Sequence, residues 1–220
     1  MTTQLTTQLT TQPTAQPTAQ PLPQPGAVLP RTLTAGDLLL RPLAESDEPA
    51  VAGALRDAEI LRWAAGRAVT QAPEAERARR WLEPRMAGWA TGNAWFAVTD
   101  TDHDTLLGAL SIREVNRLPD QATVTYWVAA PARGRGLAAK ALDAAARWAF
   151  AEPADGGLGL HRITLDHALL NTHSCAVAER AGFRIEGTMR DYYVDAGGAR
   201  HDSHLHARLA TDAVADLNGQ

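Results

Sequence analysis

Residues 123–148 read TVTYWVAAPARGRGLAAKALDAAARW, and this stretch decides the fold. Apolar and polar side chains alternate through Thr123–Ala129, which predicts a strand. From Leu137 to Trp148 apolar residues recur at helical spacing, which predicts a helix with one apolar stripe. The turn Arg133-Gly134-Arg135-Gly136 lies between them, where glycines permit a tight bend and the helix start offers free N–H groups. The stretch therefore predicts a strand, a turn that binds an anion such as phosphate, and a helix.

The same turn excludes two common nucleotide-binding motifs. It lacks the Gly-Lys-Ser/Thr ending of a P-loop, and its glycines do not follow the G-x-G-x-x-G spacing of dinucleotide-binding folds. A glycine turn that only connects a strand to a helix remains the plain alternative. The surrounding sequence must therefore indicate what the turn binds.

The rest of the chain alternates strand and helix patterns, which predicts a mixed α/β fold. The polar turn 100–104 between two apolar runs predicts a hairpin. We expect Ser46 to cap the first helix, with Pro49 in its first turn, and Trp89 to extend the apolar side of the second. The expected strands are 38–41, 94–99, 106–113, 123–129, 160–166, 183–188 and 201–209, and the expected helices are 46–55, 73–89, 137–148 and 172–181.

Composition and charge limit the class of protein. The 220 residues allow one domain of ordinary size, and 45% hydrophobic residues suffice for a core. The formal charge of −4 argues against binding nucleic acid or anionic lipid over the whole surface. The single cysteine, Cys175, cannot form an intramolecular disulfide, and no cysteine spacing typical of zinc motifs occurs. Without a bilayer-spanning run or a secretory signal, we expect a cytoplasmic protein.

The N-terminal segment differs from the rest. Residues 2–21 are five tetrads of Thr, Thr or Ala, Gln, and Leu or Pro, and residues 1–26 carry no charged side chain. Such a segment cannot bury enough apolar surface to offset the roughly 1–2 kcal/mol per residue that ordering costs. We therefore expect residues 1–28 to be a disordered tail, either inert or a recruitment arm, and residues 29–220 to form the domain.

Three motifs together resemble the GNAT superfamily of acyltransferases. Arg133–Ala138 matches the signature (Gln/Arg)-x-x-Gly-x-(Gly/Ala) and follows a strand, as that signature requires. Asn171–Phe183, followed by Glu186–Arg190, is similar to the closing helix and strand of the RimJ/RimL-type branch, which includes ribosomal-protein alanine and serine acetyltransferases. Leu38–Leu43 resembles the opening of that branch. The motifs occur in the expected order over about residues 33–210.

The resemblance implies the GNAT acyl-CoA N-acyltransferase fold, a curved, mixed and mostly antiparallel sheet flanked by helices. Acetyl-CoA, as cosubstrate, would lie where two central parallel strands diverge. Backbone N–H groups of the glycine turn would hold the pyrophosphate, with charge from Arg133 or Arg135, while the backbone amide of Val128 would polarise the thioester carbonyl. The cofactor-binding residues implied are Trp127, Val128, Ala129, Arg133, Gly134, Arg135, Gly136, Leu137, Ala138 and Asn171.

The resemblance also implies a role for Ser174. In related enzymes the serine of an N-x-x-S motif protonates the departing thiolate, and the motif here is Asn171–Ser174. A cap or an ordinary hydrogen-bonding serine is the alternative. The general base is missing, because Thr123-Val-Thr-Tyr126 replaces the glutamate and glycine that this branch often has. We expect direct transfer in a ternary complex, with Val128 and Ser174 as the catalytic residues.

Several groups are candidates for the missing base: Glu114, Asp120, Asp191 and the C-terminal histidines. Alternation in 201–208 places Asp202, His204, His206 and Arg208 on one side of a strand. That side is expected to face the acceptor cleft, or to be the hydrogen-bonded polar face of an edge strand. Two histidines at i and i+2 can hold a metal, but no third close ligand is evident in the sequence, so no metal site is predicted.

The acceptor is left open by the sequence. Trp63 lies in the segment that lines the acceptor site in relatives, and Cys175 is expected to pack on a helix, with acyl carriage as the alternative. A weak base suffices for an α-amine, with a pKa near 8, but not for lysine near 10.4. A protein or peptide N-terminus, or a small amine such as an antibiotic, is therefore the expected acceptor. Another donor such as succinyl-CoA, a non-catalytic acyl-CoA-binding module, and a homodimer remain open.

Overall fold

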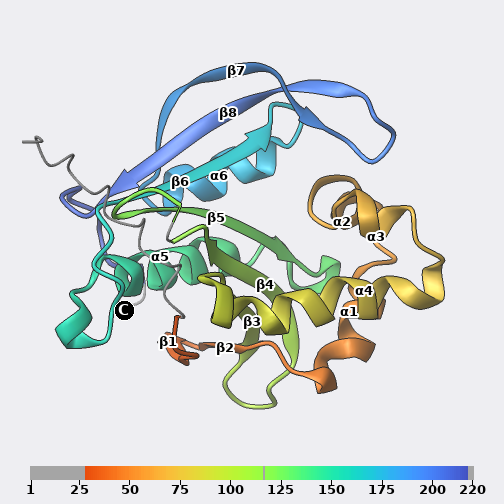
Figure 1. The fold of residues 1–220 in the computed structure, drawn as a ribbon, viewed down its shortest axis with the longest axis horizontal. Coiled ribbons are helices and arrows are strands. Elements are labelled where there is room, and N and C mark those ends of the chain that lie inside the picture. The colour runs from red at the N-terminus through yellow and green to blue at the C-terminus, as the bar shows by residue number, and fades with distance from the viewer. Residues whose placement is uncertain (1–27, 116, 218–220) are drawn as a thin grey trace, which may run out of the picture.

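The computed structural model describes residues 28–115 and 117–217. They form an eight-stranded sheet with the strand order β1-β2-β3-β4-β5-β6-β8-β7 (Figure 1). All neighbouring pairs are antiparallel except β5 and β6, which confirms the predicted mixed, mostly antiparallel sheet. The strands are β1 (Leu33–Ala35), β2 (Leu38–Pro42), β3 (Ala94–Asp100), β4 (Leu106–Arg113), β5 (Gln121–Val128), β6 (Arg162–Ala168), β7 (Arg184–Val194) and β8 (Arg200–Leu209).

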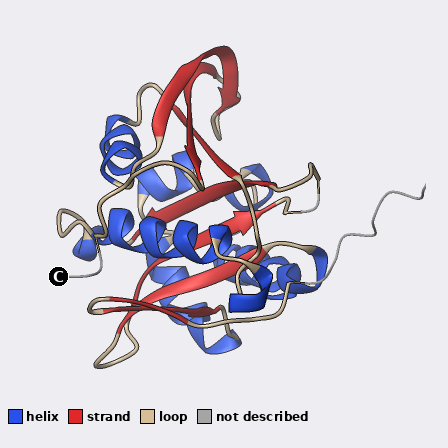
Figure 2. Ribbon diagram, turned by 90° about the vertical axis from the view of Figure 1, so that its left-hand side faces the viewer, coloured by secondary structure: helices blue, strands red, loops and turns tan. Residues whose placement is uncertain are grey.

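Helices cover both faces of the sheet (Figure 2). The long helix α5 and helix α6 bury one face, while α1 to α4 pack on the other against Trp127 and its neighbours. The α-helices are α1 (Glu48–Ala54), α2 (Ala58–Trp63), α3 (Arg67–Thr70), α4 (Glu74–Met86), α5 (Leu137–Phe150) and α6 (Thr172–Arg180). Short 3-10 helices lie at Glu45–Asp47, Ala87–Thr91, Ala130–Ala132 and Pro153–Asp155.

Strands β5 and β6 pair over only three residues before they diverge. Gln121, Ala122 and Thr123 lie opposite Arg162, Ile163 and Thr164, and no pairing between these strands continues beyond them in the described chain. The C-terminal half of β5, including Val128, therefore has β4 on one side and, on the other, an edge that is not paired with β6, which we call the opening. This opening is where the resemblance places acyl-CoA.

Most of the predicted elements are confirmed within one to three residues, including the hairpin of β3 and β4 and the helix α5. The stripe of α5 is buried as expected, at Leu137, Ala141, Ala145 and Trp148. Alternation in β5 is also confirmed, since Val124 and Trp127 pack in the clusters on opposite faces. Strand β7 continues beyond the predicted end at residue 188 to Val194.

Three expectations are wrong. Ser46 does not cap α1, because the Asp47 carboxylate accepts the Ala44 N–H at 2.9 Å and a 3-10 turn precedes the helix. Trp89 lies in a separate 3-10 helix after α4. Strand β8 is not an edge strand, since it lies between β6 and β7. The short elements β1, α2 and α3 were not predicted.

The predicted tail lies outside the described residues except for its last one. Val28 is buried in the core, and its N–H donates to Trp89 O at 2.9 Å, so ordered packing includes residue 28. Among the described residues, no helix has the length and apolar character needed to cross a membrane.

Candidate active site

The start of α5 presents backbone N–H groups that have no partner. The first hydrogen bond of this helix is the one that Lys140 N donates to Gly136 O at 3.2 Å. The N–H groups of residues 134–139 donate to no acceptor in the described chain, and no side chain caps the helix. Free N–H groups at the positive end of a 14-residue helix form a site for an anion.

Two glycines hold the turn in this shape. Gly134 has φ +78° and Gly136, the N-cap residue, has φ +75°. Other residues reach this left-handed region only at a cost of about 1–2 kcal/mol. The backbone therefore favours glycine at both positions of the signature.

Basic side chains around the turn have different partners. Arg133 is engaged by the protein, because Nε donates to Val128 O at 3.1 Å and Nη1 lies 3.0 Å from the Asp57 carboxylate. Arg135 is exposed. Arg180, at the end of α6, was not predicted, yet a Cβ on Gly136 would lie 3.4 Å from its Nη1. Arg135 and Arg180, rather than Arg133, are thus the groups available to a phosphate.

Asp57 connects the turn to the helices on the other face of the sheet. It is the N-cap of α2 and accepts the N–H groups of Glu59 and Ile60. Burial alone would raise the pKa of Asp57, but the hydrogen bonds from Arg133 and these backbone groups lower it overall. Asp57 therefore stays ionised and holds Arg133 against the end of β5.

The backbone of β5 offers one amide to the opening. Ala129 N donates to Leu107 O at 2.9 Å, so the N–H of Ala129 points toward β4. Successive N–H groups of a strand point to opposite sides, so that of Val128 points away from β4 toward the opening. The N–H of Val128 thus faces away from β4, whereas Trp127 and Ala129 direct their N–H groups to β4. The Trp127 side chain is buried against Trp81, with ring centroids 5.7 Å apart.

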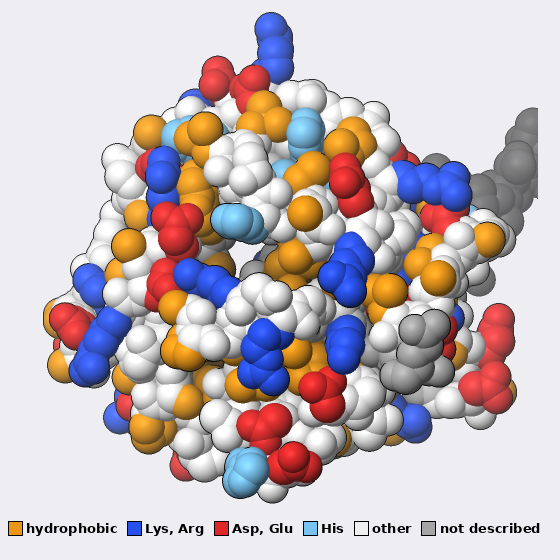
Figure 3. Space-filling model, turned by 180° about the vertical axis from the view of Figure 1, so that it is seen from behind, with side chains coloured by type: hydrophobic (Ala, Val, Ile, Leu, Met, Phe, Trp, Pro, Cys, Tyr) orange, Lys and Arg blue, Asp and Glu red, His pale blue; other side chains and the backbone are white. Residues whose placement is uncertain are grey.

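A narrow apolar cavity adjoins these amides. Its lining includes Gly108, Tyr126, Val128, Leu137 and Ala138, from β4, β5 and the first turn of α5. It brings the predicted strand and helix residues together. One face of the molecule is hollowed near its centre, with Lys or Arg side chains on several sides of the hollow (Figure 3).

Ser174 lies in the first turn of α6, hydrogen-bonded to Tyr126. The two hydroxyl oxygens are 3.0 Å apart, and Tyr126 also approaches Ser174 O at 3.3 Å. Burial raises the pKa of Tyr126 to about 12, so its hydroxyl stays protonated at neutral pH. Asn171 is the N-cap of α6, and its side chain accepts Ser174 N–H at 3.4 Å. The structure thus places Asn171 as a cap, while Tyr126 was missed as a partner of Ser174.

The predicted base candidates are engaged elsewhere or distant from the opening. Glu114 pairs with Arg117 at 3.0 Å, and Asp191 is exposed on β7. Asp120 precedes β5 at the end where the two central strands still pair. Asp166, which was not predicted, lies two residues after Thr164, the partner of Thr123, and so on the same face of the sheet as Thr123. Desolvation by the surrounding protein raises the pKa of Asp166, although the residue is exposed to solvent.

A family comparison decides what this arrangement is. A family model described as "Acetyltransferase (GNAT) domain" matches residues 37–184, which include the turn, the divergent strands and Ser174. The chain belongs to the GNAT acetyltransferase family.

Individual GNAT proteins agree with this assignment. "Putative ribosomal N-acetyltransferase YdaF" of Bacillus subtilis is 34% identical over 106 residues, or 48% of this chain and 54% of the relative, so the match spans about half of its length. Mycobacterium smegmatis RimJ, solved in complex with CoA-disulfide, is 27% identical with a TM-score of 0.66, covering 84% of this chain and 88% of that one. A Bacillus anthracis GNAT acetyltransferase has 21% identity and a TM-score of 0.69, covering 83% and 100%, and supports the fold alone.

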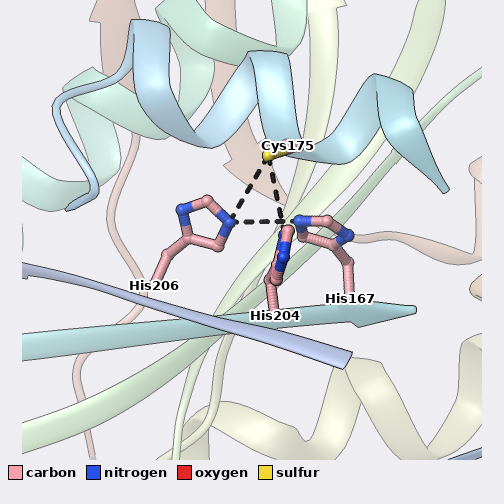
Figure 4. A group of neighbouring side chains, drawn as sticks. All are labelled: His167, Cys175, His204 and His206. Atoms are coloured by element: carbon pink, nitrogen blue, oxygen red, sulfur yellow. Dashed lines mark hydrogen bonds between the residues drawn. The ribbon is translucent and has the colours of Figure 1, made fainter. Parts of the chain in front are cut away.

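The C-terminal strand of this GNAT domain differs from expectation. His206 is fully buried, and Arg208 is 4% exposed and bonded to Asp143 at 2.7 Å, so this side of β8 faces α5 and α6 rather than an acceptor cleft. A basic side chain beside the thioester would favour a succinyl donor, and burial excludes Arg208 from that position. His204 and His206 instead lie close to His167 and Cys175 (Figure 4). Burial lowers the pKa of His167 and of His206, and raises that of Cys175.

The opposite side of β8 takes part in contacts between the β7–β8 hairpin and helix α2. The hairpin of β7 and β8 extends toward α2 (Figure 1), where Trp63 packs against Tyr193 and His201 with ring centroids 5.5 and 5.9 Å away. Tyr193 donates its hydroxyl to Arg62 O at 2.8 Å, and His201 pairs with Asp195 at 2.9 Å. Trp63 therefore joins the helical layer to the hairpin, on the same face of the sheet as Asp166.

Proposed function

We propose that the protein is an N-acetyltransferase that moves the acetyl group of acetyl-CoA to a primary amine by direct transfer in a ternary complex. The observation that carries this proposal is the set of unpartnered N–H groups at residues 134–139, next to the Val128 N–H at the divergence of β5 and β6. Pyrophosphate binds the first set, and Val128 donates to the thioester carbonyl. A fixed donor of this kind stabilises the negative charge that develops on that oxygen.

Ser174 and Tyr126 handle the leaving group in this proposal. When the C–S bond breaks, Ser174 donates its hydroxyl proton to the CoA sulfur and regains a proton from solvent, while the Tyr126 hydroxyl 3.0 Å away stays protonated and orients the serine oxygen. Asp166 receives the proton that the attacking amine loses. The position of Asp166 supports this role. It lies on β6, across the opening from β5, and on the same face of the sheet as Thr123, where the branch often has glutamate.

The acceptor in this proposal is an α-amine at the N-terminus of a protein or peptide, in the cytoplasm. The names of YdaF and RimJ point to ribosomal-protein N-termini as the first substrates to test. The side of the sheet that carries Asp166 is bounded by Trp63 and the β7–β8 hairpin, which suits an extended chain end. A weak base is adequate for an α-amine, since about one-tenth of it is neutral at pH 7.

The decisive experiment is calorimetric titration of the full chain with acetyl-CoA. Gly136→Asp is expected to abolish binding, because the added carboxylate at the helix start repels the pyrophosphate. The backbone at φ +75° is also strained for a residue that has a side chain. Gly53→Asp is the matched control, since a Cβ there meets nothing within 4 Å. Unchanged binding by Gly136→Asp would overturn the assignment of the turn.

A thiol-release assay with acetyl- and succinyl-CoA on peptides and small amines then separates the donors, and binding without transfer would indicate a non-catalytic module.

A further inference from the structure

Four side chains from three elements converge beneath α6. His167 lies on β6, Cys175 on α6, and His204 and His206 on β8, and one potential ligand atom of each lies within 4.8 Å of all the others (Figure 4). Strand register explains the convergence, because His167 is paired with His204 and Leu165 with His206, so the three rings share one face. Neutral imidazoles and a thiolate are the ligands of zinc in proteins.

Two of the rings each have one nitrogen beside a backbone carbonyl. Nδ1 of His167 is 3.0 Å from Ala168 O, and Nδ1 of His206 is 3.4 Å from Phe183 O. A carbonyl oxygen only accepts, so a hydrogen on each Nδ1 satisfies both carbonyls and leaves a lone pair on each Nε2. The two Nε2 atoms face each other at 3.1 Å.

Two lone pairs at this distance repel unless a proton or a cation lies between them. A proton would place a positive charge on one of two residues that are 6% and 0% exposed, and no carboxylate of the described residues is hydrogen-bonded to either ring. A metal ion accepts both lone pairs at once, and the nearby Cys175 sulfur can supply a negative charge. The arrangement therefore favours a metal over an added proton.

The distances agree with tetrahedral coordination. Bond lengths of about 2.0–2.1 Å for Zn–N and 2.3 Å for Zn–S place two nitrogens about 3.3 Å apart and a nitrogen and a sulfur about 3.6 Å apart. The corresponding separations are 3.1 Å between the Nε2 atoms of His167 and His206, and 3.9 Å from Cys175 Sγ to His204 Nδ1 and to His206 Nε2. These three separations are close to the ideal values, and the full set of four ligand atoms lies within 4.8 Å, so side-chain movements of up to about 1 Å complete the site.

We propose that His167, Cys175, His204 and His206 bind one Zn²⁺ in a tetrahedral site. Four protein ligands leave no open position, so the ion is structural rather than catalytic. On binding, the S–H bond of Cys175 breaks, sulfur keeps the electron pair as the zinc ligand, and the proton goes to solvent past Glu179, whose carboxylate is 3.6 Å from Sγ. The carbonyls of Ala168 and Phe183 orient the two buried rings as outer-shell partners.

The ion would connect α6 to two strands of the sheet. Cys175 is the only proposed ligand on the helix, and it directly follows Ser174, so zinc fixes the part of α6 that carries the serine. Cys175 and His204 are only partly buried, which leaves a path for the metal to enter. Because zinc binds the folded state, it is expected to raise the thermal stability with the logarithm of its free concentration above Kd.

The test uses the full chain without a histidine tag, treated with a chelator and then titrated with Co²⁺ and Zn²⁺ in the absence of CoA. We expect one Co²⁺ per chain, with the intense visible bands of tetrahedral cobalt and a thiolate charge-transfer band, both displaced by Zn²⁺. X-ray absorption of the zinc form should give one sulfur and three nitrogen neighbours. No stoichiometric binding, or a spectrum of octahedral cobalt without thiolate, would overturn the proposal.

Variants locate the site. Cys175→Ser should remove the charge-transfer band and weaken binding at least about 100-fold, since even outer-shell changes cost 10–100-fold. His204→Asn, at a partly exposed ligand, should weaken it similarly without loss of the fold, as checked by circular dichroism. His103→Asn, on an exposed turn, is the matched control and should change nothing. Wild-type affinity in both Cys175→Ser and His204→Asn would show that the metal binds elsewhere and overturn the assignment.

Discussion

The two helices beside the opening begin in opposite ways. The start of α6 is closed by its own sequence, because the Asn171 side chain accepts the Ser174 N–H. The start of α5 is left open, since Gly136 has no side chain to cap it and residues 134–139 keep unpartnered N–H groups. The capped start of α6 holds the side chains of its first turn in place, whereas the uncapped start of α5 leaves backbone N–H groups available to a ligand.

This difference separates binding from chemistry. The open start of α5 is suited to hold a diphosphate, since several amides can act together where one helix-terminus interaction contributes only about 0.3–1 kcal/mol. The closed start of α6 is suited to hold Ser174 against Tyr126. Changes at α5 should therefore alter the Kd for acetyl-CoA, and changes at Ser174 should alter kcat.

The largest effect is expected from the proton-handling groups. Ser174→Ala and Asp166→Asn should each lower kcat about 100-fold, within the 10²–10⁴-fold range of general acid–base catalysis, and leave the Kd for acetyl-CoA within about twofold. Steady-state kinetics with an N-terminal peptide and calorimetry measure the two quantities. Asp166→Glu, which retains the carboxylate, is the conservative control for the base. Turnover at the wild-type rate in either variant would remove that residue from the mechanism.

A smaller effect is expected from the cap of α6. Asn171→Ala should cost about 1 kcal/mol of stability, which lowers Tm by about 2–4 °C in a chain of this size. Asn171→Asp keeps the acceptor oxygen and should retain most of the stability. The Kd for acetyl-CoA should stay within about twofold. A tenfold rise in Kd would instead show that Asn171 contacts the pantetheine, as the family motif implies. The start of α6 would then contribute to binding as well as to chemistry.

The parts of the fold set by local sequence were predicted well. The stripe of α5 and the alternation in β5 extend over enough residues for their periods to show. Helices α2 and α3 have six and four residues, too few for a periodic signal. Ser46 failed as a cap because Asp47 binds both Ala44 N–H and Arg41, a preference that depends on the fold around Arg41.

The same distinction holds at the site. The glycine turn was predictable because it is contiguous, and the outward N–H of Val128 follows from strand alternation. Tyr126 meets Ser174 across 48 residues, and His167 meets His206 across 39, so neither contact has a local pattern. The single signal for the histidine cluster was the spacing of His204 and His206, and the other two ligands come from α6 and β6.

The smallest effect is expected where the two helices meet. Arg180 ends α6 and lies against Gly136 at the start of α5, so it adds a positive charge to the open start. Because an exposed charge at a helix start contributes about 0.3–1 kcal/mol, Arg180→Ala should raise the Kd for acetyl-CoA about two- to fivefold, and the difference should shrink at high salt. Arg79→Ala, which removes an exposed arginine from α4, is the control and should not change Kd. An equal Kd for Arg180→Ala and wild type at low salt would show that the amides of α5 bind the diphosphate without help from α6.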